Sequence, residues 1–77
     1  MDSVMIKTRI VEFAQENIGV EVLEGEDLRE CGVDSLSLVL LITGLEDVFG
    51  VQFNEDDLDP DKLIVLDDLV NLVGKYV

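Results

Sequence analysis

Apolar residues recur at helical spacing over the first eighteen positions of the chain. They are Val4, Ile6, Ile10, Val11, Phe13, Ala14 and Ile18, a recurrence close to the 3.6-residue period of an α-helix. Ser3 can act as the helix N-cap, and Gly19 is a typical stop signal. The pattern predicts a first helix over residues 3–17.

The segment from Gly19 to Gly32 has no sustained period and is rich in glycine and acidic residues. It is predicted to be a long surface loop, held to the core by Val22, Leu23 and Leu28. Loops of this length in a small domain are usually functional, so the residues directly after this loop are candidates for a functional site.

A second helical segment, which opens at about residue 35 and ends at Gly50, has two apolar faces. The i, i+3, i+4, i+7 pattern predicts a core-facing stripe, which consists of Leu38, Leu41, Ile42, Leu45, Val48 and Phe49. On the other side, an apolar group lies near acidic residues; the group is Leu36, Val39 and Leu40, and the acids are Glu46 and Asp47. Such a patch indicates a docking surface, but single exposed leucines are also common without that role, so both interpretations stay open.

Two more helices are predicted in the last third of the chain. Asp59 can cap a short helix with Pro60 at its first position. A last helix begins at about Leu66, and its apolar face comprises Leu69, Val70, Val73 and Tyr76. Asp67 and Asp68 in its first turn and Lys75 in its last suit the helix dipole.

The predicted elements include no strand and no repeat, and the length suits a single domain over residues 1–77. The fold class is therefore all-α. We expect a small four-helix bundle of three main helices and one short helix, with a long loop between helices one and two.

The charge of the chain is strongly acidic, with 18 acidic and 5 basic residues and a net charge of −13. This charge repels phosphate backbones and attracts basic partners, so nucleic-acid binding is excluded. The longest apolar run, residues 38–42, is far shorter than the roughly 18 residues that span a bilayer. With one cysteine and no signal peptide, the chain is expected to be a cytoplasmic monomer.

The chain has no histidine, which removes the commonest general base and the commonest zinc ligand. Catalysis by Ser35 or Cys31 lacks an activator, so the chain is predicted not to be an enzyme. Cys31 lies among Glu30 and Asp34, whose charges disfavour a thiolate, and is predicted to be a small buried apolar residue.

An acidic stretch contains Asp57, Asp59 and Asp61 at alternate positions, as in an EF-hand calcium loop. Lys62 occupies the sixth position, where that loop needs glycine, and the twelfth is Asp68 instead of glutamate. We therefore expect a solvated acidic turn and no metal site, with these three aspartates as weak candidates.

Ser35 opens the second helix, where backbone N–H groups and the helix dipole favour an attached phosphate. The site needs no base of its own to carry a phosphodiester. Asp34 or Ser35 can equally be a plain N-cap, and position alone favours that interpretation.

The surroundings of Ser35 add a family resemblance. Residues 32–36 (GVDSL) follow an acidic loop and open an apolar helix that ends in residues 45–50 (LEDVFG). Together with residues 57–60 and 66–70, they resemble the acyl carrier proteins and the similar peptidyl carrier proteins, in particular the free-standing carriers. The resemblance covers nearly the whole chain.

The resemblance implies that a phosphopantetheinyl transferase moves 4′-phosphopantetheine from coenzyme A onto Ser35. The thiol of this arm then holds acyl or aminoacyl groups as thioesters and brings them to loading, synthase and transferase enzymes with basic docking surfaces. It also implies that partners recognise the helix that begins at Ser35; the matching positions are Asp34, Leu36, Glu46 and Asp47.

The chain departs from fatty-acid-synthesis carriers at Ser37 and Leu40, where those carriers usually have acids. With Leu36 and Val39, Leu40 makes the outer face more apolar, which predicts a specialised carrier with its own partners, in secondary metabolism or modified lipid assembly. The alternative is a small acidic helical module that binds proteins or divalent cations and lacks the arm.

Overall fold

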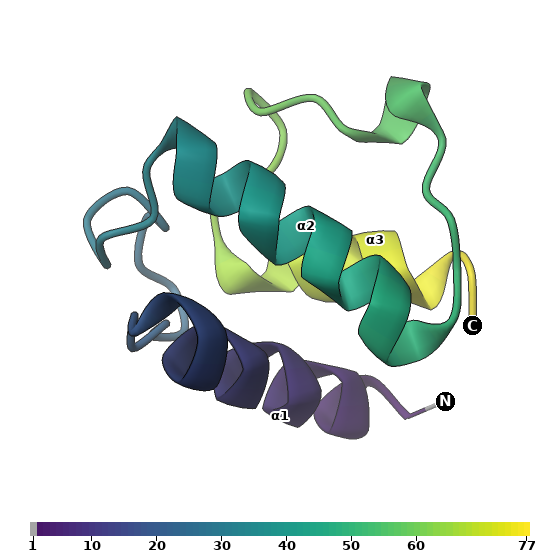
Figure 1. Ribbon diagram of the computed structural model, residues 1–77, viewed down its shortest axis with the longest axis horizontal. Helices are drawn as coiled ribbons and strands as arrows, with labels where there is room; N and C mark the ends of the chain where they lie inside the picture. The colour runs from purple at the N-terminus through teal and green to yellow at the C-terminus, as the bar shows by residue number, and fades with distance from the viewer. Residues whose placement is uncertain (1) are drawn as a thin grey trace.

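The computed structural model describes residues 2–77 and contains helices α1 (Ser3–Phe13), α2 (Ser35–Phe49) and α3 (Leu66–Gly74). A π-helical stretch, η1 (Ala14–Ile18), continues α1, and a 3₁₀ turn, η2 (Glu55–Asp57), interrupts the connection from α2 to α3 (Figure 1). Residues 2–77 form no strand. The predicted all-α bundle of three main helices and one short helix is confirmed.

The N-cap of α1 lies one residue earlier than the sequence predicts. The N–H of Val4 donates to Asp2 Oδ1 (2.9 Å), and Asp2 has the extended backbone of an N-cap, so Ser3 is the first helical residue and the predicted Ser3 cap is wrong. At the other end, Gly19 adopts φ 74°, and its N–H donates to the Ala14 carbonyl. The predicted stop is confirmed, because this left-handed conformation suits glycine.

The core is aliphatic and draws on all three α-helices. The largest side chains with almost no exposure are Ile6, Ile10, Val33, Leu41, Leu45, Leu66, Leu69 and Val73. Three residues predicted to face the core are exposed instead: Val4, Leu23 and Val48. Val4 and Val48 lie next to the ends of α1 and α2, so the predicted periods hold in the middle of these helices and fail at their ends, and Leu23 lies in the loop before α2.

The connection between α2 and α3 differs from its prediction. The 3₁₀ turn η2 lies before Pro60, and the one or two helical turns predicted after Asp59 are a single turn over residues 60–62. Asp59 caps this turn, since its Oδ1 accepts from the N–H of Asp61 (2.9 Å) and its carbonyl from the N–H of Lys62 (2.9 Å). The turn ends there because Leu63 is drawn into the core.

Asp68 starts α3. Its Oδ2 accepts from the N–H groups of Ile64 (2.9 Å) and Val65 (3.0 Å), two donors that have no partner within the helix. The predicted apolar face of α3 is confirmed, although Lys75 and Tyr76 follow the helix instead of lying within it. None of the helices in residues 2–77 combines the length and apolar character needed to cross a bilayer.

Candidate functional site

Ser35 is the first residue of α2, and Asp34 is its N-cap. Asp34 Oδ1 accepts from the N–H of Ser37 (2.8 Å), and the Asp34 carbonyl accepts from the N–H of Leu38 (2.8 Å). Capping therefore falls to Asp34, and the exposed Ser35 hydroxyl makes no hydrogen bond to any other residue of the range 2–77. The hydroxyl is free to be modified.

The cap also determines the charge next to Ser35. The N–H of Ser37, with a smaller contribution from the Ser37 hydroxyl, lowers the pKa of the Asp34 carboxyl below its ordinary value. The Asp34 carboxylate therefore stays ionised to more acidic pH than an ordinary aspartate, and it is held against the helix start.

Two anchors position Ser35 from the loop that precedes α2. The N–H of Leu28 donates to the Ile64 carbonyl (2.8 Å), and the N–H of Val33 donates to the Leu28 carbonyl (2.9 Å). Leu28 and Val33 are each only 2% exposed, so this turn is tied to the core and to the segment before α3. Ser35 stands two residues after the second anchor, which fixes the site on a rigid base.

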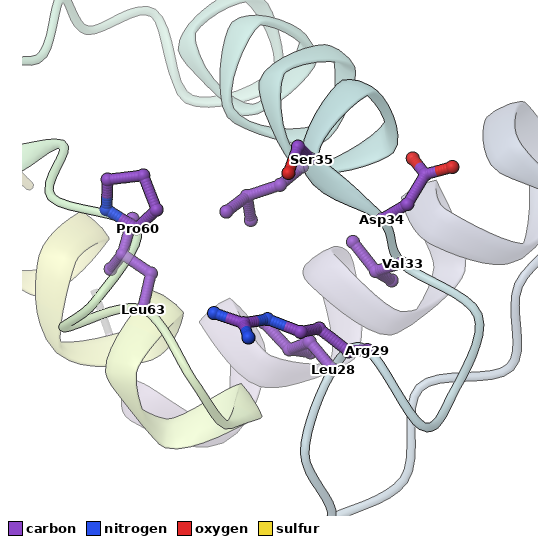
Figure 2. Close-up of a pocket in the computed structure, with 8 residues that line it drawn as sticks. Leu28, Arg29, Val33, Asp34, Ser35, Pro60 and Leu63 are labelled. Atoms are coloured by element: carbon purple, nitrogen blue, oxygen red, sulfur yellow. The ribbon is translucent and has the colours of Figure 1, made fainter.

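The surface beside Ser35 is hollowed on two sides. Figure 2 shows a small hollow below Ser35, with Leu28 and Val33 on one side and Pro60 and Leu63 on the other. A second cleft of about 230 Å³ runs along α2 toward the α2–α3 connection. Its lining, mostly aliphatic, is Ser35, Leu38, Val39, Ile42, Thr43, Glu46, Leu58 and Pro60. An apolar chain attached near Ser35 would have this cleft within reach.

The predicted apolar patch lies on the outer face of α2. Leu36 is 70% exposed, Val39 59% and Leu40 56%, which confirms that these side chains face solvent. Asp47 is exposed as well. Glu46 differs, because it is half-buried and its Oε2 accepts from the N–H of Phe53 (2.8 Å), so its carboxylate already holds the chain after α2.

Two of the three aspartates proposed as weak calcium ligands have other side-chain partners. Asp57 accepts hydrogen bonds from the Tyr76 hydroxyl and from Lys75 Nζ (3.1 Å), and Asp59 caps its own turn. Asp61 lies exposed on that turn. Nowhere in residues 2–77 do three or more histidine, cysteine, aspartate or glutamate side chains gather in a way that could hold a metal ion.

Tyr76 is a residue whose role the sequence analysis missed. Its hydroxyl donates to Asp57 and accepts from the N–H of Asn54 (3.0 Å), and its ring meets Phe53 edge to face at 5.2 Å. The hydrogen bond from Tyr76, followed by that from Lys75, lowers the pKa of the Asp57 carboxyl; the same bond to Asp57 raises the pKa of Tyr76. The end of the chain thus ties down the connection that borders the apolar cleft.

Two residues of the loop before α2 lie in surroundings that the sequence did not predict. Cys31 is half-buried, so the prediction of a buried residue is wrong; Leu28 and Val33 take the core positions, and the Cys31 Sγ lies 4.0 Å from Glu26 Oε2. Arg29 was not singled out, but it lines the hollow below Ser35. Only the folded turn brings its side chain there.

Comparison with known proteins agrees with this geometry. The family described as "Phosphopantetheine attachment site" matches residues 8–73, a range that contains Ser35. The acyl carrier protein of Campylobacter lari is 32% identical over 68 residues, which are 88% of this chain and 86% of that protein. The acyl carrier protein of Saccharopolyspora erythraea is 38% identical over 63 residues, 77% of this chain and 66% of that protein.

A longer protein contains a similar segment. The non-reducing polyketide synthase pks12 of Talaromyces marneffei is 42% identical over 55 residues, which are 68% of this chain but 3% of the synthase. No solved structure matches the chain at a comparable level of significance. The chain therefore belongs to the acyl carrier protein family, whose covalently attached cofactor is 4′-phosphopantetheine.

Proposed function

We propose that Ser35 carries the 4′-phosphopantetheine and that the chain uses this arm to bring acyl groups, held as thioesters, to successive partner enzymes. The observation that supports this proposal is the state of the Ser35 hydroxyl. It is exposed, it opens α2, and the neighbouring Asp34 performs the capping that would otherwise occupy it.

The attachment reaction follows from the groups present. The Ser35 oxygen attacks the phosphorus that bears the pantetheine, a new P–O bond forms, and the diphosphate bond of coenzyme A breaks to release adenosine 3′,5′-bisphosphate. The chain has no histidine, and no basic side chain contacts the hydroxyl, so the serine proton must pass to a base of the transferase. The resulting diester has one negative charge at the start of α2, where the helix dipole stabilises it by about 0.3–1 kcal/mol.

The apolar cleft along α2 supports an acyl cargo over an aminoacyl one. Leu38, Val39, Ile42 and Leu58 supply an aliphatic lining, and Ser35 stands at its edge. An alkyl chain that leaves water for such a lining gains about 0.8 kcal/mol for each buried CH₂ group. The charged ammonium of an aminoacyl group would lose hydration there, and the one carboxylate among the lining residues, Glu46, already accepts from the N–H of Phe53.

Ser35 is tested by intact mass after incubation of the chain with coenzyme A and a broad-specificity phosphopantetheinyl transferase. The wild type is expected to gain one arm, and Ser35→Ala none. Ser37→Ala is the matched control, since it removes a hydroxyl two positions further along the same helix and should still gain one arm. An arm on Ser35→Ala, or none on the wild type, would refute the assignment.

The outer face of α2 is proposed as the partner-recognition surface. Leu36, Val39 and Leu40 would pack against an apolar area of the enzyme, with Asp34 and Asp47 meeting basic side chains around it. Leu40→Glu is expected to slow arm attachment and acyl transfer by the enzymes of the source organism. Met5→Glu, which alters an exposed apolar residue of α1, is the control. Rates equal to wild type in Leu40→Glu would contradict an apolar contact at this position.

A further inference from the structure

A third hollow, more open than the small hollow below Ser35 and the cleft along α2, also borders Ser35. Arg29 is the one basic side chain among the residues that line it. That hollow is bounded by Arg29, Gly32, Asp34, Ser35, Pro60 and Asp61. Two of the other four cations are engaged elsewhere, since Lys7 pairs with Glu24 and Asp67, and Lys75 pairs with Asp57; Arg9 and Lys62 do not line this hollow. Arg29 forms no ion pair within 4.0 Å with any carboxylate of residues 2–77, so its guanidinium is available for an anion.

The loop holds the Arg29 backbone in place and directs its side chain toward the site. The N–H of Arg29 donates to Asp27 Oδ1 (2.8 Å), and its carbonyl accepts from the N–H of Gly32 (3.1 Å). The adjacent Leu28 is a buried anchor of the same turn. In Figure 2 the guanidinium extends into the space below Ser35, toward Pro60 and Leu63.

The negative charge around Ser35 would be stabilised by a nearby cation. The chain has a net charge of −13, and two carboxylates, Asp34 and Asp61, line the same hollow. The arm adds a phosphodiester, which is a further negative charge one bond away from the Ser35 oxygen. The Asp34 carboxylate is already engaged by the N–H of Ser37, whereas the Arg29 guanidinium has no such engagement. A planar guanidinium is the side chain best suited to paired hydrogen bonds with phosphate oxygens.

We propose that Arg29 is a positioning residue that binds the phosphodiester of the arm, an inference that rests on Ser35 as the attachment site. Ser35 and Pro60 line both this hollow and the apolar cleft along α2. A phosphate held by Arg29 would therefore keep the root of the arm at the boundary between the two. Arg29 has no part in forming the thioester and acts only through the position of the arm.

The test compares the forms with and without the arm, for wild type, Arg29→Gln and Arg9→Gln. Arg9→Gln is the matched control, because it removes the same charge from an exposed position of α1, beside Glu12 and Glu16. Melting temperatures are measured at low salt, after intact mass has shown complete loading of each variant. Absence of the arm at that step would count against Ser35 and not against Arg29.

The expected result concerns the change in melting temperature when the arm is attached. We expect this change to be more favourable in wild type and Arg9→Gln than in Arg29→Gln, by roughly 1–8 °C, and the difference to shrink at high salt. A purely structural role of Arg29 would shift both forms equally. The same change on loading in Arg29→Gln and wild type would overturn the proposal.

A second measurement uses only the wild-type chain and does not depend on the folding of any variant. The Nε–Hε resonance of Arg29 is compared between the form without the arm and the form with it, and the resonance of Arg9 is the internal reference. We expect the Arg29 signal to shift and the Arg9 signal to stay. Two unchanged signals would show that the guanidinium does not meet the phosphodiester.

Discussion

Helices α1 and α2 approach each other closely at Gly44, where the ring of Phe13 fills the space that a side chain would need. A Cβ atom placed on Gly44 would lie 1.9 Å from Phe13 Cζ and 2.5 Å and 2.7 Å from the two Cε atoms. Such distances are far inside van der Waals contact. Gly44→Ala must therefore displace the half-buried Phe13 ring from the edge of the core.

The net effect of Gly44→Ala is a balance of two opposing terms. Overpacking of a formed interface costs about 1–3 kcal/mol. Replacing glycine by alanine inside a helix returns about 0.8–1.0 kcal/mol. Because the ring is half-buried and can swing partly outward, we expect a net loss of about 1 kcal/mol, which corresponds to a fall in melting temperature of roughly 4–8 °C for a domain of this size.

Thermal unfolding followed by circular dichroism measures this loss. Gly74→Ala is the matched control, since a Cβ at Gly74 meets nothing within 4 Å; it should leave the melting temperature unchanged or raise it. Phe13→Leu should restore part of the stability of Gly44→Ala, as a double-mutant cycle would show. The reasoning is refuted if Gly44→Ala melts at or above the wild-type temperature.

Three further predictions concern stability. Tyr76→Phe removes the hydrogen bond that lowers the pKa of the Asp57 carboxyl in the folded state. A carboxyl whose pKa is lowered by folding stabilises the folded state at pH values above its unfolded pKa of 3.8, and this stabilisation is lost as the pH falls. The wild type should therefore lose more stability than the variant on acidification. Equal losses in urea unfolding at neutral and acid pH would contradict this. Leu45→Ala, at a position with 0% exposure, should cost about 2–5 kcal/mol and leave little helical signal on mild heating. A net charge of −13 predicts a melting temperature that rises with sodium chloride, and a fall would show that self-repulsion is not the dominant electrostatic term.

The sequence predicts the long helices of the fold well, because the hydrophobic period and the glycines that end helices are local signals. Gly19 and Gly50 end their helices in the left-handed conformation, at the positions that the pattern indicates. The one or two helical turns predicted after Asp59 are a single turn for a non-local reason. Asp59 and Pro60 do favour a helix start, but burial of Leu63 and the capping of α3 by Asp68 leave room for only one turn.

The candidate site was predicted at Ser35, but the division of roles around it was not. Sequence position allows either Asp34 or Ser35 to cap α2, and only the hydrogen bond from Ser37 to Asp34 distinguishes them. Arg29 was missed because its approach to Ser35 depends on the contact of Leu28 with Ile64, which are far apart in the chain. Pairings of this kind leave no local pattern in a single sequence.

The proposed attachment site combines buried residues on both sides of the α2 start with an accessible serine. Val33 is buried two residues before Ser35, and Leu41 is buried six residues after it, so the helix start is held from both sides. Between them, Ser35 and Leu36 face solvent. We expect a carrier with its arm on Ser35 to need this arrangement, because each enzyme would have to reach the same serine in the same orientation while the attached arm moves. Burial of the flanking residues, and not any bond to Ser35 itself, is what makes its position reproducible.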